Sequence, residues 1–111
     1  LTRSRVEGAE ADLVTSKAQF DSASNDVMLE VRKAWHALAE AKEALNASLE
    51  AERQARETYE LAEGRYEAGV GSSLEISDAV ESYASAQTNT ILSLYECKAK
   101  RLDLEKAMGG L

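Results

Sequence analysis

The sequence contains no proline, a single cysteine and few aromatic residues. Because proline breaks the interior of a helix, its absence permits helices of unusual length. The lone Cys97 has no partner for an internal disulfide bond and no second thiolate for a cysteine-based metal site. No apolar run reaches the roughly 18 residues that suggest a membrane-spanning helix. No alternating run rich in Val, Ile or Thr is long enough to indicate a strand.

What the chain does contain is typical of long helices. Ala, Glu, Ser and Leu dominate its 111 residues, and Ala, Leu, Glu, Lys and Arg cost little in a helix. The formal net charge is −7, with 13 basic residues dispersed among 20 acidic ones. Nucleic acids are bound by clustered Lys and Arg, so we expect no nucleic-acid partner. The composition predicts an all-α fold.

The helical pattern is clearly interrupted at one place, around Val70. Gly69 and Gly71 flank this residue, and glycine reaches positive φ without a clash at Cβ. Ser72 followed by Glu75 has the spacing of a capping box, which indicates that a new helix starts there. The interruption therefore predicts a turn that closes a helical hairpin.

We expect a long helix over residues 1–66, a turn over 67–73 and a returning helix over 74–108. Gly109-Gly110 should stop the second helix, because glycine commonly follows a helix C-terminus. No signal peptide is visible at the start of the sequence, where the helical pattern is already established. We therefore expect the chain to be a fragment of a longer protein.

The long helix has one doubtful segment, the run of poor helix formers from Asp21 to Asp26. A break at Ser22–Asn25 would give a three-helix bundle, which is the alternative fold. A heptad row passes straight through the segment, and a turn would normally disturb its phase, so we favour continuity. The row consists of Leu13, Phe20, Val27, Ala34, Ala41, Ser48, Ala55 and Ala62.

A second row runs beside the first, and two such rows form a seam for coiled-coil-like packing. It comprises Val31, Leu38, Leu45, Glu52, Tyr59 and Tyr66. The returning helix offers one row of Ile76, Tyr83, Thr90, Cys97 and Leu104, and we expect its second row to be Val80, Gln87, Leu94 and Arg101. One antiparallel register then pairs Tyr66 with Ile76, Tyr59 with Tyr83, Glu52 with Thr90, Leu45 with Cys97, and Leu38 with Leu104.

The two predicted helices differ in length, so residues 1–30 have no partner within the chain. Leu13, Val14 and Phe20 would then be exposed, which a soluble monomer tends to avoid. Other apolar residues also fall off the seam: Trp35, Leu49, Leu61, Ile91, Leu92, Tyr95 and Leu102. A helix with several apolar faces usually has several neighbours. The sequence therefore predicts that the hairpin belongs to a larger wall of helices.

The turn and both helices resemble the TolC-like outer membrane efflux channels over nearly the whole chain. The residues that carry the resemblance are the segment from Arg65 to Ser72, the segment from Leu74 to Ala79, Tyr83 and Ala86, and the closing segment from Leu104 to Gly109. The segment from Glu30 to Trp35, followed by an alanine-rich helix, is similar to the family's long helix.

The resemblance implies a trimeric export duct with strands in the outer membrane and a helical barrel across the periplasm. The hairpin would be a periplasmic part of this duct wall. Its tip would meet a periplasmic adaptor protein, and through the adaptor, indirectly, an inner-membrane transporter. By position, Ala68, Gly69 and Val70 would form the adaptor contact.

The resemblance also implies a gated entrance. Glu75 and Asp78 match acidic positions that ring it, and Tyr66 matches a tyrosine that holds the tip closed in some members. Gly71 stands where some members have an arginine, so this chain lacks that arginine. Read from the residues alone, Glu75 is a helix cap, and Tyr66 is a packed residue at the end of the seam.

The sequence indicates no enzyme and no cofactor. His36 has no second His or Cys ligand nearby, whereas a metal site needs three or four convergent donors. No nucleophile stands with a base and an orienting group. Two alternative functions remain at this point: an adaptor hairpin from the same export machinery, and a cytosolic coiled-coil scaffold.

Overall fold

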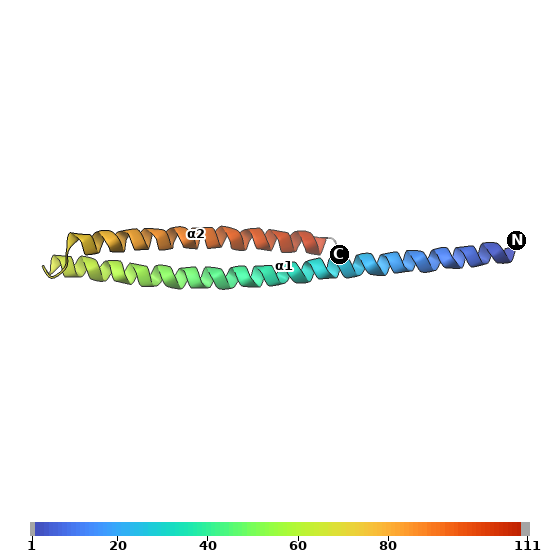
Figure 1. Cartoon of the computed structure of the whole chain (residues 1–111), viewed down its shortest axis with the longest axis horizontal. Coiled ribbons are helices and arrows are strands. Elements are labelled where there is room, and N and C mark those ends of the chain that lie inside the picture. The colour runs from blue at the N-terminus through green and yellow to red at the C-terminus, as the bar shows by residue number, and fades with distance from the viewer. Residues whose placement is uncertain (1, 110–111) are drawn as a thin grey trace.

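A computed structural model describes residues 2–109 as two helices, α1 (Thr2–Glu67) and α2 (Ser73–Gly109). α2 folds back along the C-terminal part of α1, and the N-terminal part of α1 extends beyond it (Figure 1). The molecule is a rod of 101 × 16 × 13 Å. This is the predicted all-α antiparallel hairpin.

α1 passes through Ser22–Asn25 without interruption, so the three-helix alternative is wrong. The uninterrupted heptad row was therefore a better guide than the local helix propensities. α1 ends one residue later than expected, and α2 extends one residue further at each end. Gly109 is the last residue of α2, whereas Leu1 and Gly110 lie outside the described residues.

The seam has the predicted register. The rings of Tyr59 and Tyr83 stack with their centroids 6.1 Å apart. Further from the turn, a buried cluster joins the two helices and includes the predicted partners of two other layers. It consists of Leu38, Ala41 and Cys97, with Leu45 and Leu104 packed against it. The alternation of three- and four-residue steps along both helices therefore fixes one continuous antiparallel contact.

The second row of α2 differs from the prediction. Val80 and Leu94 are exposed, and the residues that turn toward α1 are instead Ala79, Ala86, Ser93, Lys100 and Ala107. This row lies opposite the small residues of α1, where the two helices approach closely and leave little room for large side chains. Ala62 is 3% exposed and Ala79 is 6% exposed. The hydroxyls of Ser48 and Ser93 share a hydrogen bond of 2.8 Å across the seam. A row of larger side chains would hold the helix axes apart.

The N-terminal part of α1 has no neighbour within the described residues. Every residue from Thr2 to Asp26 is exposed, and Leu13, Val14 and Phe20 are among them, as predicted. Apolar side chains are also exposed beside the seam, including Trp35 and Tyr95. The core between the helices is thin, since only five of the described residues are buried. The hairpin therefore presents apolar surface on several sides.

Neither α1 nor α2 contains an apolar stretch that could serve as a membrane-spanning helix.

Replacing Ala62 by Leu should destabilise the hairpin by about 1–3 kcal/mol, because the larger side chain overpacks the close contact near Ala79. Ala47 is exposed on the same helix, so Ala47→Leu is the matched control and should leave stability nearly unchanged. Urea unfolding followed by circular dichroism measures both. Equal effects of the two substitutions would contradict the close packing of this row.

The chain on its own should associate, because Leu13 and Phe20 are exposed along a segment of α1 that has no neighbour. Light scattering at several concentrations should show a mass that rises with concentration. Replacing Leu13 and Phe20 together by Ser should shift the mass toward that of a monomer. A monomer at every concentration for the unsubstituted chain would contradict this expectation.

Candidate functional site

The turn between α1 and α2 begins with a Schellman motif. The Gly69 N–H donates to the Tyr66 carbonyl at 3.0 Å, and the Val70 N–H donates to the Arg65 carbonyl at 2.9 Å. Gly69 has a φ of +80°, which a residue with a side chain rarely adopts. These bonds satisfy carbonyls that would otherwise be unpaired at the end of α1. The turn is therefore defined by its backbone as well as by its side chains.

α2 begins with the predicted Ser72 cap. The Ser72 hydroxyl accepts a hydrogen bond from the Glu75 N–H at 3.2 Å, as an N-cap residue does. The Glu75 carboxylate accepts a hydrogen bond from Nε of Arg65 in α1 at 3.1 Å. In a complete capping box this carboxylate would turn back to the Ser72 N–H. Glu75 therefore joins the two helices while its backbone is capped by Ser72.

Gly71 is needed for a reason different from that of Gly69. Its N–H donates to the Arg65 carbonyl at 3.0 Å, which brings its backbone against the end of α1. A Cβ at this position would lie 3.1 Å from the Arg65 Cβ, from the Glu75 Oε2 and from the Tyr66 nitrogen. The absence of a side chain at Gly71 thus allows the close approach.

The candidate contact residues Ala68, Gly69 and Val70 lie together at the closed end of the hairpin, and all three are exposed. Val70 is 67% exposed, although it is apolar. Tyr66 is 51% exposed, so it is less packed than the seam position suggested. α1 ends one residue after Tyr66, which leaves its ring without a following layer.

The two candidate entrance acids lie in the first two turns of α2. Glu75 and Asp78 line one shallow hollow between the helices, together with Thr58, Leu61, Ala62, Ala79 and Ser82. The structure thus brings the two carboxyl-bearing residues to one hollow, whose lining does not include Val70. Asp78 takes part in none of the ion pairs found among residues 2–109.

Sequence reasoning missed the role of Arg65 at this site. The residue was part of the motif at the turn, but its pairing with Glu75 was not predicted. The available signal was the position of the two charges, since Arg65 lies in the last turn of α1 and Glu75 in the first turn of α2. In a tight hairpin these two turns are adjacent in space.

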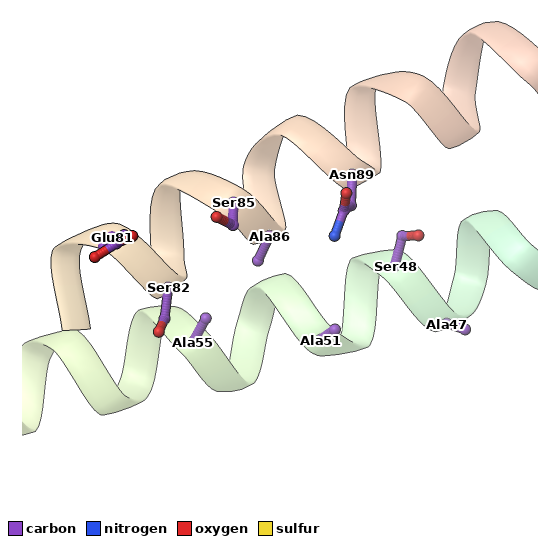
Figure 2. Close-up of a pocket in the computed structure, with 9 residues that line it drawn as sticks. All are labelled: Ala47, Ser48, Ala51, Ala55, Glu81, Ser82, Ser85, Ala86 and Asn89. Atoms are coloured by element: carbon purple, nitrogen blue, oxygen red, sulfur yellow. The ribbon is translucent and has the colours of Figure 1, made fainter. Parts of the chain in front are cut away.

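A second groove lies along the hairpin, further from the turn. Its lining consists of small and polar side chains from both helices (Figure 2): Ala47, Ser48, Ala51, Ala55, Glu81, Ser82, Ser85, Ala86 and Asn89. Because most of these side chains are short, the groove between the two helices is shallow. The groove is open, and no concentration of one charge distinguishes it as a binding pocket.

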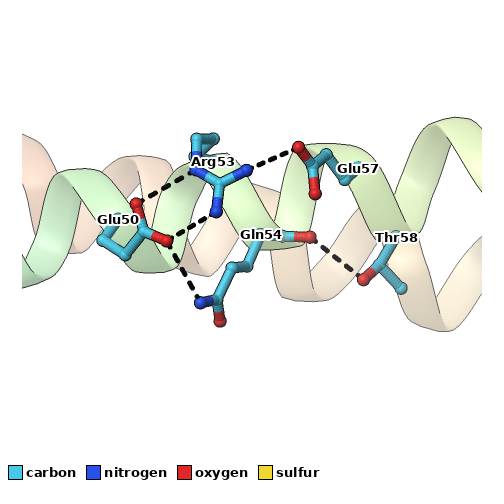
Figure 3. Close-up of polar contacts among 5 residues, drawn as sticks. All are labelled: Glu50, Arg53, Gln54, Glu57 and Thr58. Atoms are coloured by element: carbon cyan, nitrogen blue, oxygen red, sulfur yellow. Dashed lines mark hydrogen bonds and ion pairs between the residues drawn. The ribbon is translucent and has the colours of Figure 1, made fainter.

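The outer surface of α1 carries a network of charges (Figure 3). Arg53 pairs with both Glu50 and Glu57, one helical turn away on either side. The hydrogen bond from Arg53 lowers the pKa of Glu50, and Glu50 in turn raises the pKa of Arg53. The negative charge of Glu63 raises the pKa of Tyr59. Arg53, Glu50 and Glu57 are exposed, so their network keeps this side of the rod charged and contributes little to stability.

Among residues 2–109, the structure contains no group of three or more His, Cys, Asp and Glu side chains that could hold a metal ion. Cys97 is buried in the seam. The residues that stand out are therefore those that shape the closed end of the hairpin.

Two glycines near the turn should respond to alanine in opposite directions. Gly69→Ala should destabilise the hairpin by about 1–2 kcal/mol, because alanine is strained at positive φ. Gly64 lies inside α1, and a Cβ added there would meet nothing within 4 Å. Gly64→Ala should therefore stabilise the hairpin by roughly 0.5–1 kcal/mol. Urea unfolding measures both, and an unchanged or higher stability of Gly69→Ala would contradict the role of Gly69.

Comparison with known proteins supports the outer membrane resemblance. Residues 2–110 match the family described as outer membrane efflux protein. Searches of curated proteins and of solved structures gave no significant match. The matched family is one of transport channels and not of enzymes. Because the match covers nearly its whole length, this chain belongs to the outer membrane efflux protein family.

Proposed function

We propose that this hairpin is part of the periplasmic duct wall of an outer membrane efflux or type I secretion channel. In this proposal the channel is a homotrimer, and the closed end of the hairpin docks a periplasmic adaptor protein. The adaptor links the channel to an inner-membrane transporter. Family membership supports the channel over an adaptor hairpin or a cytosolic scaffold.

The shape and surface of the hairpin support the wall role. The rod is 101 Å long and only 16 × 13 Å across, and it contains a thin core. Exposed apolar side chains occur along its length, for example Trp35, Leu61 and Tyr95. Long helices of this kind gain most of their stability from neighbours. Lateral packing against other hairpins would cover these side chains and close the wall of a duct.

Val70 carries the docking proposal. It is an apolar side chain, 67% exposed, within the turn that closes the hairpin. Three hydrogen bonds to the carbonyls of Arg65 and Tyr66 fix the backbone of this turn. A rigid apolar projection binds with little loss of conformational entropy. Ala68 and Gly69 beside it have little or no side chain, so the end of another helical hairpin could approach their backbone closely.

The entrance role is proposed for Tyr66, Glu75 and Asp78. Three symmetry copies of the two carboxylates would make the mouth of the duct negative and favour cations there. Tyr66 has a half-exposed ring at the end of α1, where it could contact a neighbouring hairpin and hold the mouth closed. These assignments are supported by position at the turn and by the shared face of Glu75 and Asp78.

The docking proposal is tested in cells that express the full-length protein with its adaptor. A photo-crosslinking residue at Val70 should give a covalent product that mass spectrometry identifies as the adaptor. The same residue at Asn46, exposed on the shaft of α1, is the control and should give no such product. Val70→Asp should abolish export, whereas Asn46→Asp adds the same charge and should not.

Two results would overturn the docking proposal. One is a crosslink from Val70 that reaches only another copy of the channel protein. The other is unchanged export by Val70→Asp at an unchanged level of protein in the outer membrane. Either would show that the closed end of the hairpin is not the surface that meets the adaptor.

A further inference from the structure

Arg65 contacts the turn through both its backbone and its side chain. Its carbonyl accepts hydrogen bonds from the Val70 N–H at 2.9 Å and from the Gly71 N–H at 3.0 Å. Its guanidinium donates from Nε to the Glu75 carboxylate at 3.1 Å and reaches the Val70 carbonyl at 3.5 Å. One residue at the end of α1 is thus bonded to both sides of the turn.

We infer that Arg65 is a positioning residue: by holding Glu75 across the turn, it fixes the conformation in which Val70 is presented to the adaptor. The inference rests on the proposed docking function. Of the ion pairs found among residues 2–109, the pair of Arg65 and Glu75 is the one that joins α1 to α2. The others link residues three or four apart within one helix.

The sequence around the pair favours its formation. Gly71 lies between the two side chains, and a Cβ there would come within 3.1 Å of both Arg65 and Glu75. The positive charge is in the last turn of α1 and the negative charge is in the first turn of α2. Each charge is therefore also favoured by the dipole of its own helix. The lack of a side chain at Gly71 and the charges at the two helix ends therefore both favour the contact between Arg65 and Glu75.

The pair also distinguishes the two candidate entrance acids. The Glu75 carboxylate is engaged by a guanidinium, so much of its charge is compensated locally. Asp78 lines the same hollow and has no such ion pair among residues 2–109. Asp78 would therefore supply more of the proposed negative charge at the entrance than Glu75, which also positions the turn together with Arg65.

Hydrogen exchange of the full-length protein, read by mass spectrometry, tests the contact. Arg65→Met keeps a long side chain beside Gly71 and removes the charge, and Glu75→Gln removes the opposite one. Each should raise the exchange rates of the Val70 and Gly71 amides about two- to fivefold, the range expected for a partly exposed ion pair. The double variant should exchange no faster than Arg65→Met alone, because Arg65→Met already removes the interaction that Glu75→Gln removes.

Arg53→Met is the matched control. Arg53 is also a half-exposed arginine of α1 with glutamate partners, but it lies on the shaft. Arg53→Met should leave the exchange rates of the amides at the turn unchanged. Unchanged exchange at Val70 and Gly71 in Arg65→Met, or additive effects in the double variant, would overturn the contact between Arg65 and Glu75 as the element that holds the turn.

The crosslink from position 70 to the adaptor provides the functional readout. Its yield should fall about two- to fivefold in Arg65→Met and Glu75→Gln, in proportion to the exchange rates. Arg53→Met should keep the full yield, and Arg65→Lys should restore part of it. Faster exchange with an unchanged yield would overturn the positioning role. If the protein without these substitutions gives no adaptor crosslink, the docking proposal fails, while the exchange rates still decide whether Arg65 holds the turn.

Discussion

The close approach of two helices along a row of small side chains is the constraint on which the rest of this structure depends. Ala62 and Ala79 are buried in that row, and Ser48 and Ser93 are hydrogen-bonded across it. Short side chains bury little apolar area each, so the contact between α1 and α2 is narrow and the core is thin. Because the narrow seam has room for few large side chains, many of the larger apolar side chains are exposed instead. A hairpin held in this way has apolar surface left for neighbours.

Much of the fold could be predicted from the sequence, because heptad spacing and the glycines at the turn both carry physical information. The rows that contain Tyr59 and Tyr83 gave the register, and the unbroken phase through Ser22–Asn25 gave the continuity of α1. The second row of α2 was predicted wrongly. Hydrophobicity favours Val80 and Leu94, but hydrophobicity does not reveal how closely two axes approach. The small residues of α1 would have been the better guide to the face that α2 presents.

The site was predictable only in part. The local roles of Gly69, Val70 and Ser72 could be predicted from residue type. Positive φ at Gly69, exposure of Val70 in a turn and helix capping by Ser72 are all short-range properties. The contact between Arg65 and Glu75 depends on the path of the chain between them, which brings residues ten positions apart together. A charge at each helix end indicates that such a pair is favourable but does not show that it forms. The family match identifies the chain as an outer membrane efflux protein but assigns no role to these contacts.

The repeating seam has a consequence for how such hairpins can change in length. A slip of α2 by one heptad would place Ala86 opposite Ala62 and would still set small residues against small ones, so the repeat alone allows several alignments. The stacked tyrosines and the short turn select one of these alignments. An insertion of one heptad in each helix would preserve both the pairing and the turn. Hairpins of different length could therefore share the same turn, with whole heptads added to or removed from both helices.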